Sequence, residues 1–451
     1  MFNKIDLNHE FTSKLFFLAI PIFIQSLTMS VLSFVDVIMV GQLGDSIVAG
    51  VGIANQINYI RIILSFGIAC GVGVFSAQYW GARDISNLHR FQGIGLVLSL
   101  TVGVIFLVFS VFFPHMLISF YTNDPEVIQI SSNYFGILGI SFLFTSITIV
   151  YSQVMRGTEH VKIPLIASST AFGLNTALNY LLIFGKFGFP QLGYKGAAIA
   201  TVISRVVEVG ILLIVAYIKK LPSASSIKQL INWDLSSILK FLKISSPIII
   251  HNGLWIIGIS IYAMVYGKVS TEALAAFHIC KSFENISNMV FSSFGNTGGI
   301  MLGNRLGAKE FDKARTYAYN FFFIEFLMAI LFAAIFILGR PVFILIYKLS
   351  DTGTFYLSVM LIVFGIYTLP KAGNVLLNMG ILRSGGDTRF AMFLDVGTVW
   401  LYGVPVVFIG AFILKLPVYY VVAMVSMEEV IKFSIGYIRF KKGKWVRNLT
   451  E

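Results

Sequence analysis

Residues 15–40 read LFFLAIPIFIQSLTMSVLSFVDVIMV, an apolar run with a single charged residue, Asp36. A helix needs about 20 apolar residues to cross a hydrocarbon core of about 30 Å. Eleven further runs of this kind follow, and none alternates polar and apolar residues as a membrane β-strand does. The sequence therefore predicts twelve transmembrane helices, at about 15–40, 49–79, 92–113, 134–155, 163–184, 194–217, 246–266, 274–303, 317–338, 356–380, 390–414 and 417–438.

The composition places the chain in a bilayer. Hydrophobic residues make up 57% of the 451 residues and charged residues 12%, whereas soluble domains are about 25% charged. A soluble fold could not hide this much apolar surface, and a disordered chain would be polar. Cys70 and Cys280 lie in apolar runs, so we predict neither a disulfide framework nor a CxxC metal site. His278 stands alone among possible metal ligands, so we predict no zinc site. The fold class that follows is an all-α polytopic membrane protein.

Lysine and arginine residues fall mainly on one side of the predicted spans. With both termini in the cytoplasm, the cytoplasmic segments carry 22 of the 33 basic residues, the opposite segments carry six and the spans carry five. Cytoplasmic loops of membrane proteins carry such an excess. We therefore expect a multi-pass protein of the plasma (inner) membrane with both termini in the cytoplasm. The same excess explains the net charge of +12 without a nucleic acid partner.

The second half of the sequence repeats the first at one fixed offset. Pro21 matches Pro247, and residues 81–84 (GARD) match residues 307–310 (GAKE). Six spans separate equivalent points, so the two halves have the same orientation in the membrane. We predict two pseudo-symmetric six-helix bundles that rock about a central cavity, as in a transporter. The predicted parts are an N-terminal lobe (1–220), a cytoplasmic linker with a short interfacial helix (221–245), and a C-terminal lobe with a basic cytoplasmic tail (246–451).

Charged residues inside the spans are functional candidates, because each costs about 2.5–3.5 kcal/mol to insert unless it meets water or a partner. In the first half, Asp36 is the single charge of its span and can bind a proton or a cation. Asn175 and Asn179 lie one helical turn apart, so both amides leave one face of a helix. With Thr201 on the next span, they form either an oxygen cage for Na⁺ or a proton relay, or simply hydrogen bonds between helices.

In the second half, one span carries a long polar stripe that predicts a wet cavity or a buried network. Lys371 should pair with Asp395 or Glu284, because an unpaired ammonium would be too costly there. Glu429 and Lys432 can form another pair. The residues of the stripe are His278, Lys281, Glu284, Asn285 and Asn288.

Two further sets of charged residues lie within the spans. Arg205 and Glu208, three residues apart, most simply neutralise each other. Glu325 and Glu428 have no obvious partner in the sequence.

Five stretches, taken together and in order, resemble one known family: residues 18–44 (LAIPIFIQSLTMSVLSFVDVIMVGQLG), 81–84 (GARD), 174–185 (LNTALNYLLIFG), 193–204 (GYKGAAIATVIS) and 381–390 (ILRSGGDTRF). They resemble the multidrug and toxic compound extrusion (MATE) family of the multidrug/oligosaccharidyl-lipid/polysaccharide exporter superfamily. The resemblance implies a V-shaped transporter of two six-helix lobes. It also implies an antiporter that couples H⁺ or Na⁺ entry to the export of amphiphilic, often cationic compounds, with no cofactor and no enzymatic activity.

The resemblance places a coupling-cation site, for H⁺ or Na⁺, on four residues. Some members of the family have Asp where Asn179 stands, so the site here carries one negative charge fewer. One branch has a Glu and an Asp where this sequence has Trp255 and Lys371, so the second cation site of that branch does not transfer. The residues Lys371, Asp395, Lys281 and Glu284 are candidates to replace it. The implied coupling site is Asp36, Asn175, Asn179 and Thr201.

Two other functions remain as alternatives. A flippase for lipid-linked saccharides would want a basic cavity for pyrophosphate, whereas the charges within the spans sum to 5 − 7 = −2. A multispanning enzyme acting on lipids would want clustered histidines or carboxylates at a membrane surface, and the six histidines are scattered. The expected partners are small organic molecules and the lipid bilayer, and the expected oligomeric state is a monomer.

Overall fold

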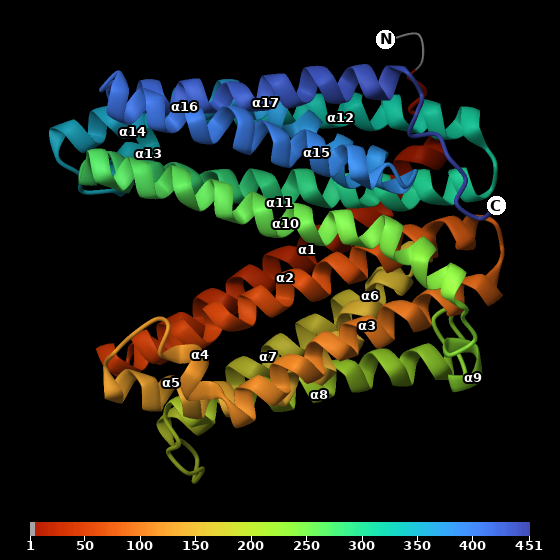
Figure 1. The fold of residues 1–451 in the computed structure, drawn as a ribbon, viewed down its shortest axis with the longest axis horizontal. Coiled ribbons are helices and arrows are strands. Elements are labelled where there is room, and N and C mark those ends of the chain that lie inside the picture. Colours follow the sequence, from red (N-terminus) through yellow and green to blue (C-terminus); the bar gives the residue numbers. More distant parts are fainter. Residues whose placement is uncertain (1–4) are drawn as a thin grey trace. The chain divides into compact units, whose positions relative to one another are not determined.

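The structure, a computed structural model that describes residues 5–451, consists of helices joined by short loops (Figure 1). The chain forms two compact units. We call Ile20–Ser245 the first lobe, and the residues up to Ala19 together with Ser246–Glu451 the second lobe. The long helices α1 (His9–Gly41) and α10 (Leu235–Val269) therefore each begin in one lobe and continue in the other.

The first lobe is built from most of α1, the start of α10 and the helices between them. Asp84 caps the third helix by accepting a hydrogen bond from the Asn87 amide, and Asp124 caps the fifth in the same way. Gly185, at φ 65°, ends the seventh helix in the left-handed conformation that glycine favours. These helices are α2 (Asp45–Gly81), α3 (Ile85–Phe112), α4 (Pro114–Ile118), α5 (Pro125–Gly139), α6 (Ser141–Gly157), α7 (Lys162–Phe184), α8 (Tyr194–Ile218) and α9 (Ile227–Leu230).

The second lobe contains the rest of α10 and the helices that follow it. Three short π-helical segments, labelled η, interrupt two of its spans. The elements are α11 (Thr271–Gly307), α12 (Phe311–Leu338), α13 (Arg340–Ile346), α14 (Asp351–Val375), η2 (Leu376–Leu382), α15 (Thr388–Thr398), η3 (Val399–Gly403), α16 (Val404–Phe408), η4 (Ile409–Ile413) and α17 (Val418–Lys441).

The helix boundaries confirm the predicted repeat. The offset that takes Pro21 to Pro247 also takes both ends of α2 onto the ends of α11, and both ends of α3 onto the ends of α12. It takes the first residue of α1 onto the first residue of α10 as well. The offset that relates the motifs in the sequence therefore also relates the helices, so the two halves are pseudo-symmetric.

The twelve predicted spans are present. By length and apolar composition, eight helical segments of the described chain can cross a membrane, and α5 with α6, bent by 49°, makes a ninth. Helices α7, α11 and α17 complete two sets of six, and they are long enough to span but carry more polar side chains. These three polar helices bear most of the candidate site residues, which is the physical reason for their lower hydropathy.

The linker differs from the expected short interfacial helix. Leu239 and Leu242 lie in the first turns of α10, which runs without a break from Leu235. The separate helix of this region is the four-residue α9, which starts at a capping box formed by Ser226 and Gln229.

The C-terminal tail is anchored on the second lobe. Trp445 is 1% exposed and stacks on Phe440. Arg439 at the end of α17 makes two hydrogen bonds to Asp387, in the turn before α15, at 2.8 and 3.0 Å. Gly385 in the same turn lies so close to the tail that an added Cβ would sit 1.6 Å from the Trp445 carbonyl oxygen.

Candidate functional site

The four residues of the expected coupling site lie together in the first lobe. The Asn179 amide nitrogen donates to Asp36 Oδ1 at 2.6 Å, and also contacts Asn175 Oδ1 at 3.2 Å. Asn175 donates to the Thr201 hydroxyl at 3.4 Å. With the Asn175 amide turned over, its nitrogen lies 3.1 Å from Asp36 Oδ1. Helices α1, α7 and α8 thus each contribute to one polar cluster.

Close packing of α7 and α8 allows this cluster to form. A Cβ at Gly196 would come within 2.6 Å of the Leu182 carbonyl oxygen, so only glycine permits the two backbones to approach this closely. Asn175 and Asn179 are 3% and 2% exposed. Asn179 Oδ1 is buried and has no hydrogen-bond partner among the described residues. The cluster therefore holds an unused acceptor oxygen beside a carboxylate.

Two arginines lie in the same lobe as Asp36 but bind other groups. Arg205, one turn beyond Thr201, pairs with Glu208 at 2.6 Å, as the spacing predicted. Arg61 is 1% exposed, donates to Asn58 at 3.0 Å and lies over the Phe142 ring at 4.5 Å. No bond joins Arg61 to Asp36 in the described chain, so hydrogen bonding at Asp36 comes from amides.

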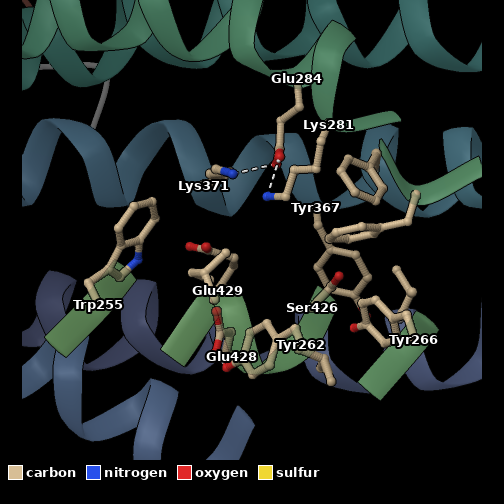
Figure 2. A pocket seen from close by; sticks show the side chains of 15 residues that line it. Trp255, Tyr262, Tyr266, Lys281, Glu284, Tyr367, Lys371, Ser426, Glu428 and Glu429 are labelled. Atoms are coloured by element: carbon tan, nitrogen blue, oxygen red, sulfur yellow. Dashed lines mark hydrogen bonds and ion pairs between the residues drawn. The ribbon is translucent and has the colours of Figure 1, made fainter. Parts of the chain in front are cut away.

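The second lobe contains a cavity of about 560 Å³ that is lined by both polar and apolar side chains. Six of the seven residues expected in a cavity or charge network line it: His278, Lys281, Asn285, Asn288, Lys371 and Asp395. Glu284, the seventh, lies in an adjoining pocket that shares Lys281 and Lys371 with the cavity (Figure 2). The polar stripe of α11 therefore faces a cavity.

One charge cluster joins α11 to α14. Lys281 donates to Glu284 Oε2 at 2.6 Å, and Lys371 of α14 donates to Glu284 Oε1. Figure 2 shows both ammonium groups pointing at this one carboxylate. The expectation that Lys371 has an acidic partner is confirmed, and of the two expected partners it is Glu284.

The alternative prediction, that Lys371 pairs with Asp395, is wrong. Asp395 belongs to a second cluster, around Lys432 on α17. Lys432 Nζ lies 2.8 Å from Asp395 Oδ1, 3.5 Å from Glu428 and 3.8 Å from Glu429. In the first cluster two cations share one carboxylate, and in the second three carboxylates surround one ammonium. The two clusters of this lobe therefore have opposite ratios of basic to acidic side chains.

Several polar contacts of this cavity and of the adjoining pocket were not predicted from the sequence. His251 contacts Asp395 Oδ2 at 2.5 Å, and Asn378 donates to the same oxygen at 3.1 Å. Glu428, for which the sequence offers no obvious partner, accepts a hydrogen bond from Tyr262 at 2.8 Å. The six histidines are scattered along the sequence, but burying an imidazole in an apolar run costs free energy, as burying a carboxylate does. A single histidine in such a run is therefore also a candidate functional residue.

Comparison with known proteins identifies the family. The sequence model described as MatE matches residues 21–181 and 247–439, one segment in each half of the repeat. The chain belongs to the MATE family. MATE proteins are membrane transporters that need no cofactor, so this chain is a membrane-embedded protein of a transporter family.

Relatives and solved structures agree over most of the chain. The "Probable multidrug resistance protein YoeA" of Bacillus subtilis is 24% identical, covering 88% of this chain and 87% of that protein. The "Probable multidrug resistance protein NorM" of Thermotoga maritima is 24% identical over 97% of this chain and 93% of its own length. A structure of MATE in the bent conformation covers 96% of both chains with a TM-score of 0.86 at 17% identity. A structure described as a MOP superfamily transporter from Pyrococcus furiosus covers 96% of both chains with a TM-score of 0.84 at 18% identity.

Proposed function

We propose that this MATE protein is a secondary active exporter, an antiporter that couples the entry of H⁺ or Na⁺ to the efflux of amphiphilic organic compounds by alternating access. The observation that carries the proposal is the cavity of about 560 Å³ in the second lobe, whose walls combine charged and amide side chains with Trp255, Ile259 and Phe277. A wall of this kind suits solutes that have both an apolar body and a polar group. Several relatives are named multidrug resistance proteins, which agrees with such solutes.

The geometry at Asp36 suits a coupling cation. A carboxylate, two amides and a hydroxyl converge there from α1, α7 and α8. The Asn179 Oδ1 atom is buried and accepts no hydrogen bond from the described residues, so it can coordinate a cation. Asp36, Asn175, Asn179 and Thr201 would hold Na⁺ through oxygen atoms, or Asp36 would take a proton while the amides keep it oriented.

Loading of Asp36 can drive alternating access only if the loaded and empty forms favour different conformations. An ionised Asp36 needs donors such as the Asn179 amide, whereas a protonated or Na⁺-bound Asp36 no longer carries a net negative charge. Helix α1 carries Asp36 in the first lobe and begins in the second lobe. A change in charge at Asp36 therefore acts on a helix that both lobes share.

The cavity does not favour the export of a pyrophosphate-linked lipid. Lys281 and Lys371 are both engaged by Glu284, and Lys432 lies among three carboxylates. The cavity therefore lacks the excess of available cations that a pyrophosphate would need. We place the protein in the plasma membrane with both termini in the cytoplasm, because basic residues concentrate on that side. We also propose that it acts as a monomer.

Dye efflux from proteoliposomes tests the proposal. Purified protein is reconstituted into liposomes, and the liposomes are loaded with ethidium. A pH gradient and a Na⁺ gradient are then imposed in separate experiments. Efflux that depends on one of the two gradients supports the proposal and identifies the ion. Wild-type protein that binds ethidium but does not move it under either gradient would contradict cation-coupled antiport.

A further inference from the structure

A carboxyl group outside both charge clusters lies buried in the middle of α12. Glu325 is the only charged residue of α12 after Arg315. It is 1% exposed, and neither of its carboxyl oxygens has a hydrogen-bond partner among the described residues. Buried polar groups without partners are rare and call for a specific explanation.

The α12 residues one turn before and one turn after Glu325 make apolar contacts with the neighbouring helices. One turn later, Ala329 packs with Phe291 of α11 and Ala372 of α14. One turn earlier, Phe321 lies against α11, where a Cβ on Gly298 would sit 3.6 Å from its ring. Glu325 thus lies between two apolar contacts of α12, and no described polar group lies within hydrogen-bond distance of its carboxyl oxygens.

The charged groups of the neighbouring elements are engaged elsewhere. On α11, Lys281 and Glu284 pair with each other, and Arg305 pairs with Glu10 and Glu310. On α14, Lys371 pairs with Glu284; on α17, Lys432 pairs with three carboxylates and Arg439 with Asp387. Helix α1 also packs on α12, through Phe11. The other titratable groups of α12 and of the elements packed against it are His9 and Lys14 on the second-lobe part of α1, Glu272, His278 and Cys280 on α11, Asp312, Lys313, Arg315, Tyr317 and Tyr319 on α12, Arg340 on α13, Asp351, Tyr356 and Tyr367 on α14, and Tyr419, Tyr420, Tyr437 and Lys441 on α17. Within residues 5–451, no hydrogen bond joins any of these groups to Glu325.

An ionised carboxylate in such a place would be buried without a counter-charge, whereas the protonated form is neutral. We propose that Glu325 binds a proton and is a second proton site of this transporter, occluded in the present conformation and separate from Asp36. This inference rests on the proposed function, because a proton site at Glu325 contributes to transport only if the protein couples export to H⁺. A proton held there adds a carboxyl of the second lobe to the coupling machinery.

Helix α14, which packs on α12, contains two features at which helices bend or distort. Helix α14 contains Pro370, which removes one backbone hydrogen bond, and continues into the π-helical segment η2. Both α14 and η2 pack on α12. Such π-helical turns occur mostly as single-turn distortions and are frequent at functional sites. A local rearrangement of this span would admit water to Glu325 and let its proton leave.

The repeat supplies a matched design for the test. The residue equivalent to Glu325 in the first half of the repeat is Ser99 on α3, which is the helix equivalent to α12. Ser99 is also fully buried, but its hydroxyl donates to the Ser146 carbonyl at 3.4 Å. Glu325→Gln keeps the size of the side chain and removes the titratable proton, and Glu325→Ser copies the equivalent position as a second variant.

Infrared spectroscopy of the full-length protein in lipid nanodiscs tests protonation without any substrate. At neutral pH, the wild type should show the carbonyl stretching band of a protonated carboxylic acid, and Glu325→Gln should lack it. Glu284→Gln is the control, because Glu284 lies between two ammonium groups and should be ionised in the wild type, so the band should survive. A wild-type spectrum without a band that Glu325→Gln removes would overturn the proposal.

Exchange of the proton separates a working site from a static one. In heavy water the Glu325 band should shift as the site opens, whereas a band that never shifts would overturn the proposal. In proteoliposomes, Glu325→Gln and Glu325→Ser should bind ethidium as the wild type does and lose most pH-driven efflux, and unchanged efflux would also overturn it. A wild type without efflux would instead contradict the proposed function, and the infrared result would still decide whether Glu325 holds an exchangeable proton.

Discussion

Lys432 of α17 and Asp395 of α15 form an ion pair of 2.8 Å in the second lobe. The Lys432 side chain is 4% exposed, and Glu428 and Glu429 also lie close to its ammonium group, at 3.5 and 3.8 Å. His251 of α10 contacts the other oxygen of Asp395. The ion pair therefore joins α17 to α15, and the contact between Asp395 and His251 adds α10.

Replacing Lys432 by Met should destabilise the protein strongly. The change leaves three carboxylates near one another without their cation, and removing one partner of a buried ion pair costs about 3–5 kcal/mol. Thermal unfolding of the purified protein in detergent should therefore begin at a clearly lower temperature. Lys441→Met, at the exposed end of the same helix, is the control and should unfold like the wild type. Equal unfolding temperatures for the two variants would show that Lys432 does not stabilise the cluster.

Replacing Gly385 by Ala should release the C-terminal tail. The new Cβ would lie 1.6 Å from the Trp445 carbonyl oxygen, so the backbone of the tail must move. Limited proteolysis should then cleave after the basic residues at 439–447 much faster than in the wild type. Gly397→Ala is the control, because nothing lies within 4 Å of a Cβ there. Equal cleavage rates in the two variants would contradict the close packing of the tail.

Hydrophobic run lengths and the repeat were enough to predict the twelve spans and the two halves, because bilayer thickness dictates helix length. Asp36 and the polar face of α11 could also be predicted from the sequence, because charged and polar side chains are costly to insert into a bilayer. The partner of Lys371 could not be decided, since Glu284 and Asp395 both lie on spans that Lys371 could reach, and helix rotation selects between them. His251 was missed because its role depends on Asp395, 144 residues away in the sequence.

Asp36→Asn should reach the membrane at normal levels and fail to export ethidium against a gradient. Asparagine keeps the size and a hydrogen-bonding oxygen but fixes the charge at zero, so the variant mimics the loaded state permanently. The measurement is efflux from proteoliposomes under imposed pH and Na⁺ gradients. Asp312→Asn, at a fully exposed carboxylate of the α12 start, should behave like the wild type. Normal gradient-driven efflux by Asp36→Asn would remove Asp36 from the mechanism and leave the charges of the second lobe to be tested.

Asn179→Asp should give the protein a stronger response to Na⁺. In the wild type the Asn179 amide nitrogen lies 2.6 Å from Asp36 Oδ1, and two ionised carboxylates at that separation repel each other. A cation between the two carboxylates relieves this repulsion. Na⁺ should therefore bind the folded Asn179→Asp variant more tightly than it binds the folded wild type.

A ligand that binds only the folded state raises its stability in proportion to the logarithm of its concentration. The unfolding temperature of Asn179→Asp should therefore rise more steeply with NaCl than that of the wild type, and KCl at equal ionic strength corrects for screening. The double variant Asp36→Asn with Asn179→Asp restores a single carboxylate and should lose the gain. An Asn179→Asp protein that responds to Na⁺ and K⁺ alike would mean that these side chains do not form a Na⁺ site, which would leave the proton as the ion that Asp36 carries.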